Sequence, residues 1–184
     1  MYGLVNKALQ DLVLTQFGQD KWEAIKEKAG ISVDTFLSMQ SYPDDITYSL
    51  VGAASEILDL TPAQVLEAFG EYWTIYTAKE GYGELLSMSG SSFVEFLQNL
   101  DNLHVRVGLS FPELKPPSFR CSDLTEKSAR LHYESDREAL TPFVVGLVKG
   151  LGTMFATTVD VSVEASKDQG HPHDEFLIRF EQQT

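Results

Sequence analysis

Two short runs of sequence, VDVSV at residues 159–163 and FLIRF at residues 176–180, decide the fold class of this chain. In both runs every second residue is apolar, which is the periodicity of a β-strand with one face in a protein core. A polar segment at residues 167–174 lies between them, so we expect an antiparallel hairpin. Residues 118–124 and 128–135 have the composition of two further strands. The sequence therefore predicts a small sheet of about four antiparallel strands.

Most of the remaining chain shows the spacing of amphipathic helices, with apolar residues three and four positions apart. Two segments, TPAQ at 61–64 and SFVE at 92–95, have the capping-box pattern that begins a helix. We expect an α+β fold with a helical N-terminal subdomain at residues 1–60 and a C-terminal subdomain at residues 61–184, in which helices pack on the sheet. The predicted helical stretches are residues 4–17, 20–30, 46–58, 62–76, 93–107 and 141–155.

Composition narrows the class of protein. The chain has 184 residues, is 43% hydrophobic and carries a formal net charge of -13, which is typical of a globular domain and unfavourable for binding nucleic acid or anionic membranes. The single Cys121 excludes an internal disulfide framework and fits a reducing compartment. The sequence has neither a signal-peptide pattern nor an apolar run long enough to span a bilayer, so we expect a cytoplasmic protein.

His104 is the most informative single residue. It lies four residues after Leu100 and seven after Leu97 in the predicted helix, so its imidazole should face the interior. In a buried neutral imidazole one nitrogen donates a hydrogen bond, and the other accepts one or binds a metal. Two interpretations stay open on these grounds: a core histidine bonded to a backbone carbonyl, or the axial ligand of a haem iron in an apolar pocket.

A second group of polar residues ends one predicted strand. Alternation places Tyr133, Ser135 and Arg137 on one face, and the same face continues inward through apolar Leu131 and Ala129. A phenol, a hydroxyl and a guanidinium at the end of an apolar surface can together bind carboxylates, and the guanidinium can do so through two hydrogen bonds. The alternative is an ordinary strand end, with these groups solvated or paired with acidic neighbours.

Several stretches resemble the haem nitric-oxide/oxygen-binding (H-NOX) family and its relative, the haem domain of soluble guanylate cyclase β subunits. The resemblance covers essentially the whole chain, and the combination of His104 with the later triplet is its most specific part. The matching segments are MYGLVN at 1–6, residues 45–55, FLQNLDNLH at 96–104, PPSFRC at 116–121, and the triplet Tyr133, Ser135 and Arg137.

The resemblance implies a haem b group buried between the two subdomains. It makes His104 the proximal ligand of the iron, assigns the haem propionates to Tyr133, Ser135 and Arg137, and places Pro117 against the porphyrin. The remaining haem-pocket residues that it implies are Met1, Leu4, Val5, Trp73, Phe143 and Leu147.

The resemblance also implies a ligand preference and a route for the signal. Oxygen-binding members have a distal tyrosine at the position of Phe143, so we expect NO and CO to be bound in preference to O2. NO is expected to break the iron bond to His104, and the conformational change would pass to a separate protein. Stand-alone bacterial relatives work with histidine kinases or cyclic-di-GMP enzymes, so a partner of this kind is implied.

Two other functions are weaker alternatives. A haem-free binding or adaptor domain could hold another carboxylated hydrophobic ligand in the same pocket. A haem enzyme such as a peroxidase needs distal acid–base groups, which Trp73, Phe143 and Leu147 do not supply, so we expect no enzymatic activity. The segment from His171 to His173 offers an incomplete ligand set for structural zinc, and solvated histidines are the preferred interpretation there.

Overall fold

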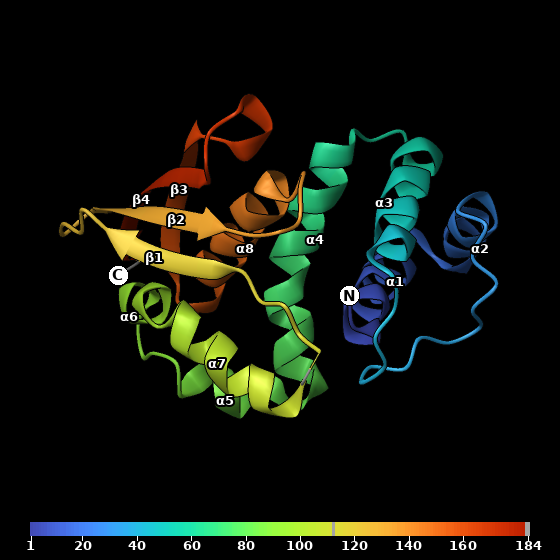
Figure 1. The fold of residues 1–184 in the computed structure, drawn as a ribbon, viewed down its shortest axis with the longest axis horizontal. Coiled ribbons are helices and arrows are strands. Elements are labelled where there is room, and N and C mark those ends of the chain that lie inside the picture. The colour runs from blue at the N-terminus through green and yellow to red at the C-terminus, as the bar shows by residue number, and fades with distance from the viewer. Residues whose placement is uncertain (112, 183–184) are drawn as a thin grey trace.

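The computed structural model describes residues 1–111 and 113–182. Its N-terminal part is helical, and α4 stands between α1–α3 on one side and the sheet with α8 on the other (Figure 1). Helix α4 begins as predicted, because the Thr61 side chain accepts from the Gln64 backbone and the Gln64 side chain accepts from the Thr61 backbone. The first helices of the chain are α1 (Gly3–Phe17), α2 (Gln19–Lys28) and α3 (Asp44–Leu58), and α4 (Pro62–Thr77) follows them.

The C-terminal part mixes helices and strands, as expected for an α+β fold. A short turn of helix (Ala78–Tyr82) follows α4, and the chain bends there because Gly81 adopts a φ of 93°, in the left-handed region that glycine tolerates. The elements that follow are α5 (Gly83–Ser87), α6 (Phe93–Gln98), α7 (Leu100–Ser110), β1 (Ser118–Ser122), β2 (Ser128–Glu134), α8 (Thr141–Met154), β3 (Thr157–Ala165), a 3-10 turn (Lys167–Gln169) and β4 (Asp174–Gln182).

The four strands form one antiparallel sheet in the order β1-β2-β4-β3. The expected hairpin is β3 with β4, and β4 also pairs with β2, so the last strand lies inside the sheet. The inner face carries Leu131, Phe176 and Ile178, all fully buried. They pack into one cluster with apolar side chains of α6, α7 and α8. The sheet therefore has one face in the core and one face toward solvent.

Helices α4 and α8 approach each other unusually closely. A Cβ atom added to Gly146 of α8 would lie 1.9 Å from the Glu67 carbonyl oxygen of α4, and one added to Gly70 of α4 would lie 2.1 Å from the Phe143 carbonyl oxygen. Only glycine permits this backbone contact. The contact fixes α8, and with it Phe143, against α4.

The predicted single helix at residues 93–107 is two helices in the structure. Asn99 has φ -102° and ψ 6°, which ends α6 and starts α7. The predicted capping box is also incomplete: Ser92 accepts from the Glu95 backbone, but the Glu95 carboxylate accepts from Ser91. The break separates α7, which carries His104, from the short helix before it. Among the residues described, no helix combines the length and apolar character needed to cross a membrane.

Candidate functional site

Helix α7 presents His104 to the interior. The residue is half-buried, and its ring centroid lies 5.6 Å from that of Phe119 in β1. Its Nδ1 atom is buried and has no hydrogen-bond partner among the residues that the structure describes. Burial lowers the pKa of His104, while the Asp101 carboxylate and the backbone carbonyl of Pro117 act in the opposite direction. The imidazole is therefore neutral at neutral pH, which is the form that binds a metal.

Asp101, one turn before His104, ties α7 to the sheet. Its carboxylate accepts from the Phe119 backbone at 2.5 Å and from the Ser118 hydroxyl at 3.2 Å. These two bonds hold α7 beside the start of β1. They explain why His104 and Phe119, fifteen positions apart in sequence, lie next to each other.

The polar triplet occupies one end of β2 and the loop that follows. Tyr133 is buried, and its ring lies 5.2 Å from Phe119, the ring that also contacts His104. Burial raises the pKa of Tyr133, and a hydrogen bond with Ser135 partly offsets the shift. Ser135 in turn accepts from the Arg137 backbone at 3.1 Å. The structure thus brings the three predicted residues together, and Phe119 connects them to His104.

Arg137 has partners that the sequence did not reveal. Its Nε donates to Oδ2 of Asp44 at 2.8 Å, and its Nη1 donates to the Lys115 carbonyl at 2.9 Å. The other oxygen of Asp44 accepts from the amino group of Met1. Asp44 is the first residue of α3, and Asp45 follows it. These two acids in the first turn of the helix are the only feature of the sequence that points to Asp44 as a partner for positive groups.

The residues present fit a haem group. His104 offers a neutral imidazole with an unpartnered buried nitrogen, and the aromatic ring of Phe119 lies beside it. Tyr133, Ser135 and Arg137 offer donors for carboxylates and border one small hollow of about 10 Å³. An apolar environment, an imidazole ligand and anchored carboxylates are what a haem site requires.

The predicted distal residues lie mainly in a second hydrophobic cluster, the N-terminal cluster, whose buried side chains come chiefly from α1, α2, α3 and α4. Leu4 is buried there, and Val5, Trp73 and Phe143 pack against the same cluster. Phe69 links two of them, with ring centroids 6.3 Å from Trp73 and 5.2 Å from Phe143. Leu147 packs instead against the C-terminal cluster, which is the one formed between the sheet and α6, α7 and α8. Met1 is half-buried, and its amino group also donates to the Tyr42 carbonyl at 2.6 Å.

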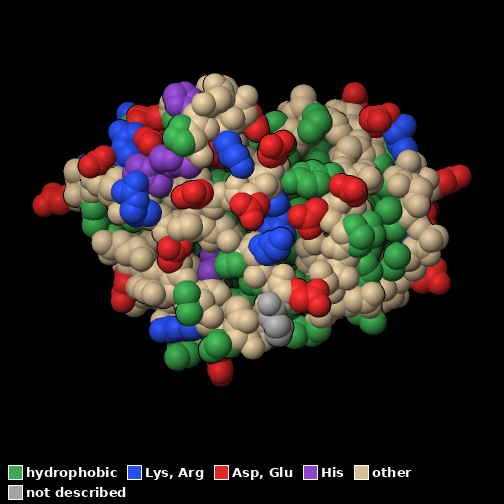
Figure 2. Space-filling model, in the orientation of Figure 1, with side chains coloured by type: hydrophobic (Ala, Val, Ile, Leu, Met, Phe, Trp, Pro, Cys, Tyr) green, Lys and Arg blue, Asp and Glu red, His purple; other side chains and the backbone are tan. Residues whose placement is uncertain are grey.

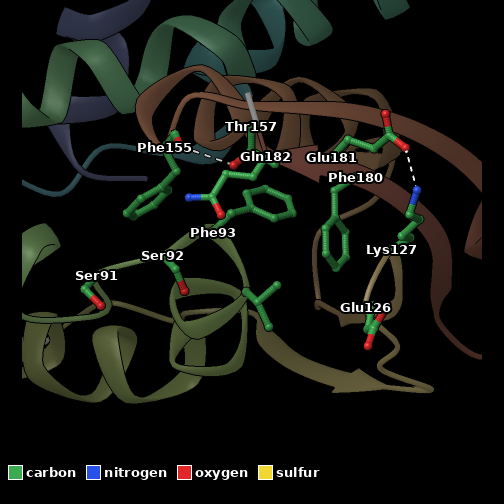
Figure 3. A pocket seen from close by; sticks show the side chains of 11 residues that line it. Ser91, Ser92, Phe93, Glu126, Lys127, Phe155, Thr157, Phe180, Glu181 and Gln182 are labelled. Atoms are coloured by element: carbon green, nitrogen blue, oxygen red, sulfur yellow. Dashed lines mark hydrogen bonds and ion pairs between the residues drawn. The ribbon is translucent and has the colours of Figure 1, made fainter. Parts of the chain in front are cut away.

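A separate pocket of about 500 Å³ opens at another part of the sheet (Figure 3). Phe93, Phe155 and Phe180 line it together with polar side chains, and the Lys127–Glu181 ion pair lies at its edge at 2.9 Å. None of the residues predicted to bind haem is among its lining residues.

Curated relatives of this chain are soluble guanylate cyclases. It is 27% identical over 164 residues to soluble guanylate cyclase gcy-31 of Caenorhabditis elegans, which covers 89% of this chain and 23% of the relative. It is 32% identical over 165 residues to gcy-37 of the same organism, covering 88% and 23%. The chain thus spans about a quarter of the length of the curated relatives it matches.

Solved structures share the fold at low sequence identity. A mutant H-NOX protein from S. oneidensis in the Fe(II) ligation state superimposes with a TM-score of 0.92 at 22% identity, covering 100% of this chain and 98% of that one. An S. oneidensis H-NOX protein in the Fe(II)NO ligation state gives 0.89 at 22% identity, covering 99% and 100%. An Fe(II) unliganded H-NOX protein from K. algicida gives 0.85 at 22% identity, covering 100% and 98%. The predicted α+β fold is therefore the H-NOX fold.

The family match extends over most of the chain. The Haem-NO-binding model matches residues 2–163, which include α1 through α8, most of β3 and every residue predicted to bind haem except Met1. With this match and the curated relatives, the chain belongs to the Haem-NO-binding (H-NOX) family, whose members are haem-binding gas-sensor domains and not enzymes.

Proposed function

We propose that this domain holds haem b through His104, Tyr133, Ser135 and Arg137, and that it senses NO and CO. When bound, the haem would supply a ferrous iron that can take up a diatomic gas, and His104 would be the residue that holds this iron. The observation that carries the proposal is the buried Nδ1 of His104, which lacks a hydrogen-bond partner among the described residues. A neutral imidazole left in this state is well suited to metal ligation.

The other residues have positioning roles. The Arg137 guanidinium can bind one propionate, while Ser135 and Tyr133 donate from the same end of β2. Pro117, whose carbonyl lies near His104, would press on the porphyrin from the proximal side. The distal wall would consist of Met1, Leu4, Val5, Trp73, Phe143 and Leu147.

Selectivity follows from the chemistry of Phe143. Bound O2 gains negative charge and is stabilised by a hydrogen-bond donor, whereas NO and CO need little such help. Phe143 has an apolar ring that packs beside Phe69. A distal wall built around these rings should therefore favour NO and CO.

The signal would start at His104. Its release from the iron would free α7, which is tied to β1 through Asp101 and whose Val107 packs against both hydrophobic clusters. Residues 1–60 and 61–184 would then shift relative to each other and present a changed surface to a separate signalling protein, such as a histidine kinase or a cyclic-di-GMP enzyme. Such a shift requires the gas to stabilise the two arrangements unequally.

Replacement of His104 by alanine tests the proposal. The wild-type protein should keep a haem absorption band through gel filtration, and His104→Ala should lose it and regain it when imidazole is added. His171→Ala is the matched control, because His171 is exposed in the segment before β4. A folded wild-type protein that takes up no haem would contradict the proposal and favour the haem-free adaptor.

A further inference from the structure

The outer face of the sheet holds a cluster of two histidines and a glutamate. His132 of β2 and Glu175 of β4 are directly paired in the sheet register, so their side chains share a face. His173 lies two positions before Glu175 and joins them. Tyr133 points to the other face, into the core. Figure 2 shows histidine side chains gathered over the sheet among basic and acidic neighbours.

The three candidate ligand atoms are spaced as a metal ion requires. Nδ1 of His132 lies 3.0 Å from Nε2 of His173 and 3.5 Å from Oε1 of Glu175, and the latter two atoms are 3.2 Å apart. A tetrahedral zinc ion with bonds of about 2.1 Å has neighbouring ligand atoms about 3.4 Å apart. The triangle already present therefore matches one face of that tetrahedron.

Two polar atoms of the cluster point away from the centre of this triangle, Nε2 of His132 and Oε2 of Glu175, and both have other partners. Nε2 of His132 is 2.8 Å from the Ser122 hydroxyl, which can accept a hydrogen bond from the protonated Nε2 and so leave Nδ1 as the nitrogen that binds a metal. Nη1 of Arg130 donates to Oε2 of Glu175 at 3.2 Å, so Oε1 stays turned toward the histidines. A hydrogen bond from the far nitrogen of a ligating histidine is typical of metal sites.

Charge and exposure also suit a cation. The side chains of His132, His173 and Glu175 are 12%, 26% and 28% exposed, so an ion could enter but would be partly shielded from water. Two arginines lie near the cluster. Arg120 of β1 is the register partner of His132, and Arg130 of β2 is matched by the carboxylates of Asp123, Glu164 and Glu175. Because the whole chain carries a net charge of -13, its surroundings favour positive ions.

We propose that His132, His173 and Glu175 form a site for a divalent transition metal ion, with Zn²⁺ the best match to two imidazoles and one carboxylate. Water would take the fourth position. The ion would join β2 to the segment before β4, on the outer side of the strand that carries Tyr133 in the core. This site is distinct from the one proposed for haem, which lies on the other side of the sheet.

Zinc binding to the full chain, without a polyhistidine tag, tests the site. After treatment with a chelator, the protein should take up about one equivalent of Zn²⁺ in competition with a chromophoric chelator. His173→Ala should weaken binding at least about 100-fold, and Ser122→Ala, which removes only the outer partner of His132, about 10-fold. Zinc X-ray absorption should show imidazole nitrogens and oxygens bound to the ion.

His171→Ala is the matched control, because His171 is exposed and two residues from His173 but is outside the cluster. It should bind zinc as the wild type does, and circular dichroism should show all variants folded. Equal losses in His171→Ala and His173→Ala, or no zinc uptake by the wild type, would overturn the proposal. Zinc uptake is measured separately from haem absorption. A failure of the zinc proposal can therefore be distinguished from a failure of the haem proposal.

Discussion

Arg137, in the loop after β2, donates from Nε to Oδ2 of Asp44 at 2.8 Å, across ninety-three residues of sequence. Asp44 is the first residue of α3, and its other oxygen accepts from the Met1 amino group. One carboxylate thus joins the N-terminal helices to the loop proposed to hold a propionate. A movement of the N-terminal helices relative to this loop would strain the ion pair between Asp44 and Arg137. We therefore expect Asp44 to influence both the stability of the fold and the binding of haem.

Asp44→Asn should destabilise the protein in a pH-dependent way. Burial raises the pKa of Asp44, but hydrogen bonds from the Met1 amino group and Arg137 outweigh it, so the net pKa is lowered from 3.8. The unfolded chain therefore binds this proton more readily, and the stabilisation is present above the unfolded pKa and lost as pH falls through the folded one. Because the side chain is 37% exposed, we expect a loss of only about 1 kcal/mol at neutral pH.

Urea unfolding at a series of pH values measures this effect. The gap in unfolding free energy between wild type and Asp44→Asn should be constant at neutral pH and close below about pH 4. A gap that persists unchanged into acid would show that the variant acts through packing and not through the ion pair.

Arg137→Gln should loosen haem without unfolding the domain. The substitution removes the charge that pairs with a propionate and leaves a shorter amide, so transfer of haem to an acceptor protein should become about tenfold faster or more. Arg179→Gln is the control, because Arg179 is an exposed arginine on β4, paired with Asp160 at 3.5 Å. Equal transfer rates in the wild type and Arg137→Gln would remove Arg137 from the proposed site.

Local sequence patterns predicted most of the fold, but not the contacts that cross it. The alternation at residues 159–163 and 176–180 and the capping box at Thr61 gave elements that the structure confirms, because they depend on neighbouring residues. The break at Asn99 was missed, since apolar spacing continues across it. The pairing of Arg137 with Asp44 could not be foreseen, because it depends on how distant segments pack.

The same limit explains what happened to the histidines. The alternation rule placed His132 opposite Tyr133, as the structure confirms, but the register between β2 and β4 sets it beside Glu175. Single-sequence patterns do not determine that register. From the sequence we therefore predicted that the His173 side chain is solvated. In the structure its Nε2 lies 3.0 Å from Nδ1 of His132. By contrast, the resemblance indicated His104 and Tyr133 directly, and Phe119 connects them in the structure.

Gly146→Ala should strongly destabilise the contact between α4 and α8. Its new methyl group would meet the Glu67 carbonyl oxygen at 1.9 Å, and a backbone atom inside a helix cannot easily move away, so we expect a cost of about 3 kcal/mol or more. Gly52→Ala is the control: among the described residues nothing lies within 4 Å of its added methyl, and in a helix alanine should stabilise by about 0.5–1 kcal/mol. In thermal unfolding, the midpoint temperature should fall for Gly146→Ala and rise for Gly52→Ala. A small change for Gly146→Ala would contradict this prediction, because it would mean that α4 and α8 can move apart at little cost in free energy.

Phe143→Tyr should create O2 binding. Phe143 packs beside Phe69 on the proposed distal side, and a tyrosine there would add a hydroxyl donor to an apolar wall. A hydrogen bond to a charged acceptor contributes about 1.5–3 kcal/mol, so O2 affinity should rise about 10-fold to 100-fold, and the ferrous protein should give a stable oxy spectrum in air.

Phe155→Tyr is the control. It places the same hydroxyl at the C-terminal end of α8, next to the C-terminal cluster, and should leave the spectrum unchanged. A stable oxy spectrum already present in the wild type would contradict the proposed selectivity, whereas an unchanged O2 affinity in Phe143→Tyr would show that this ring does not face the bound gas.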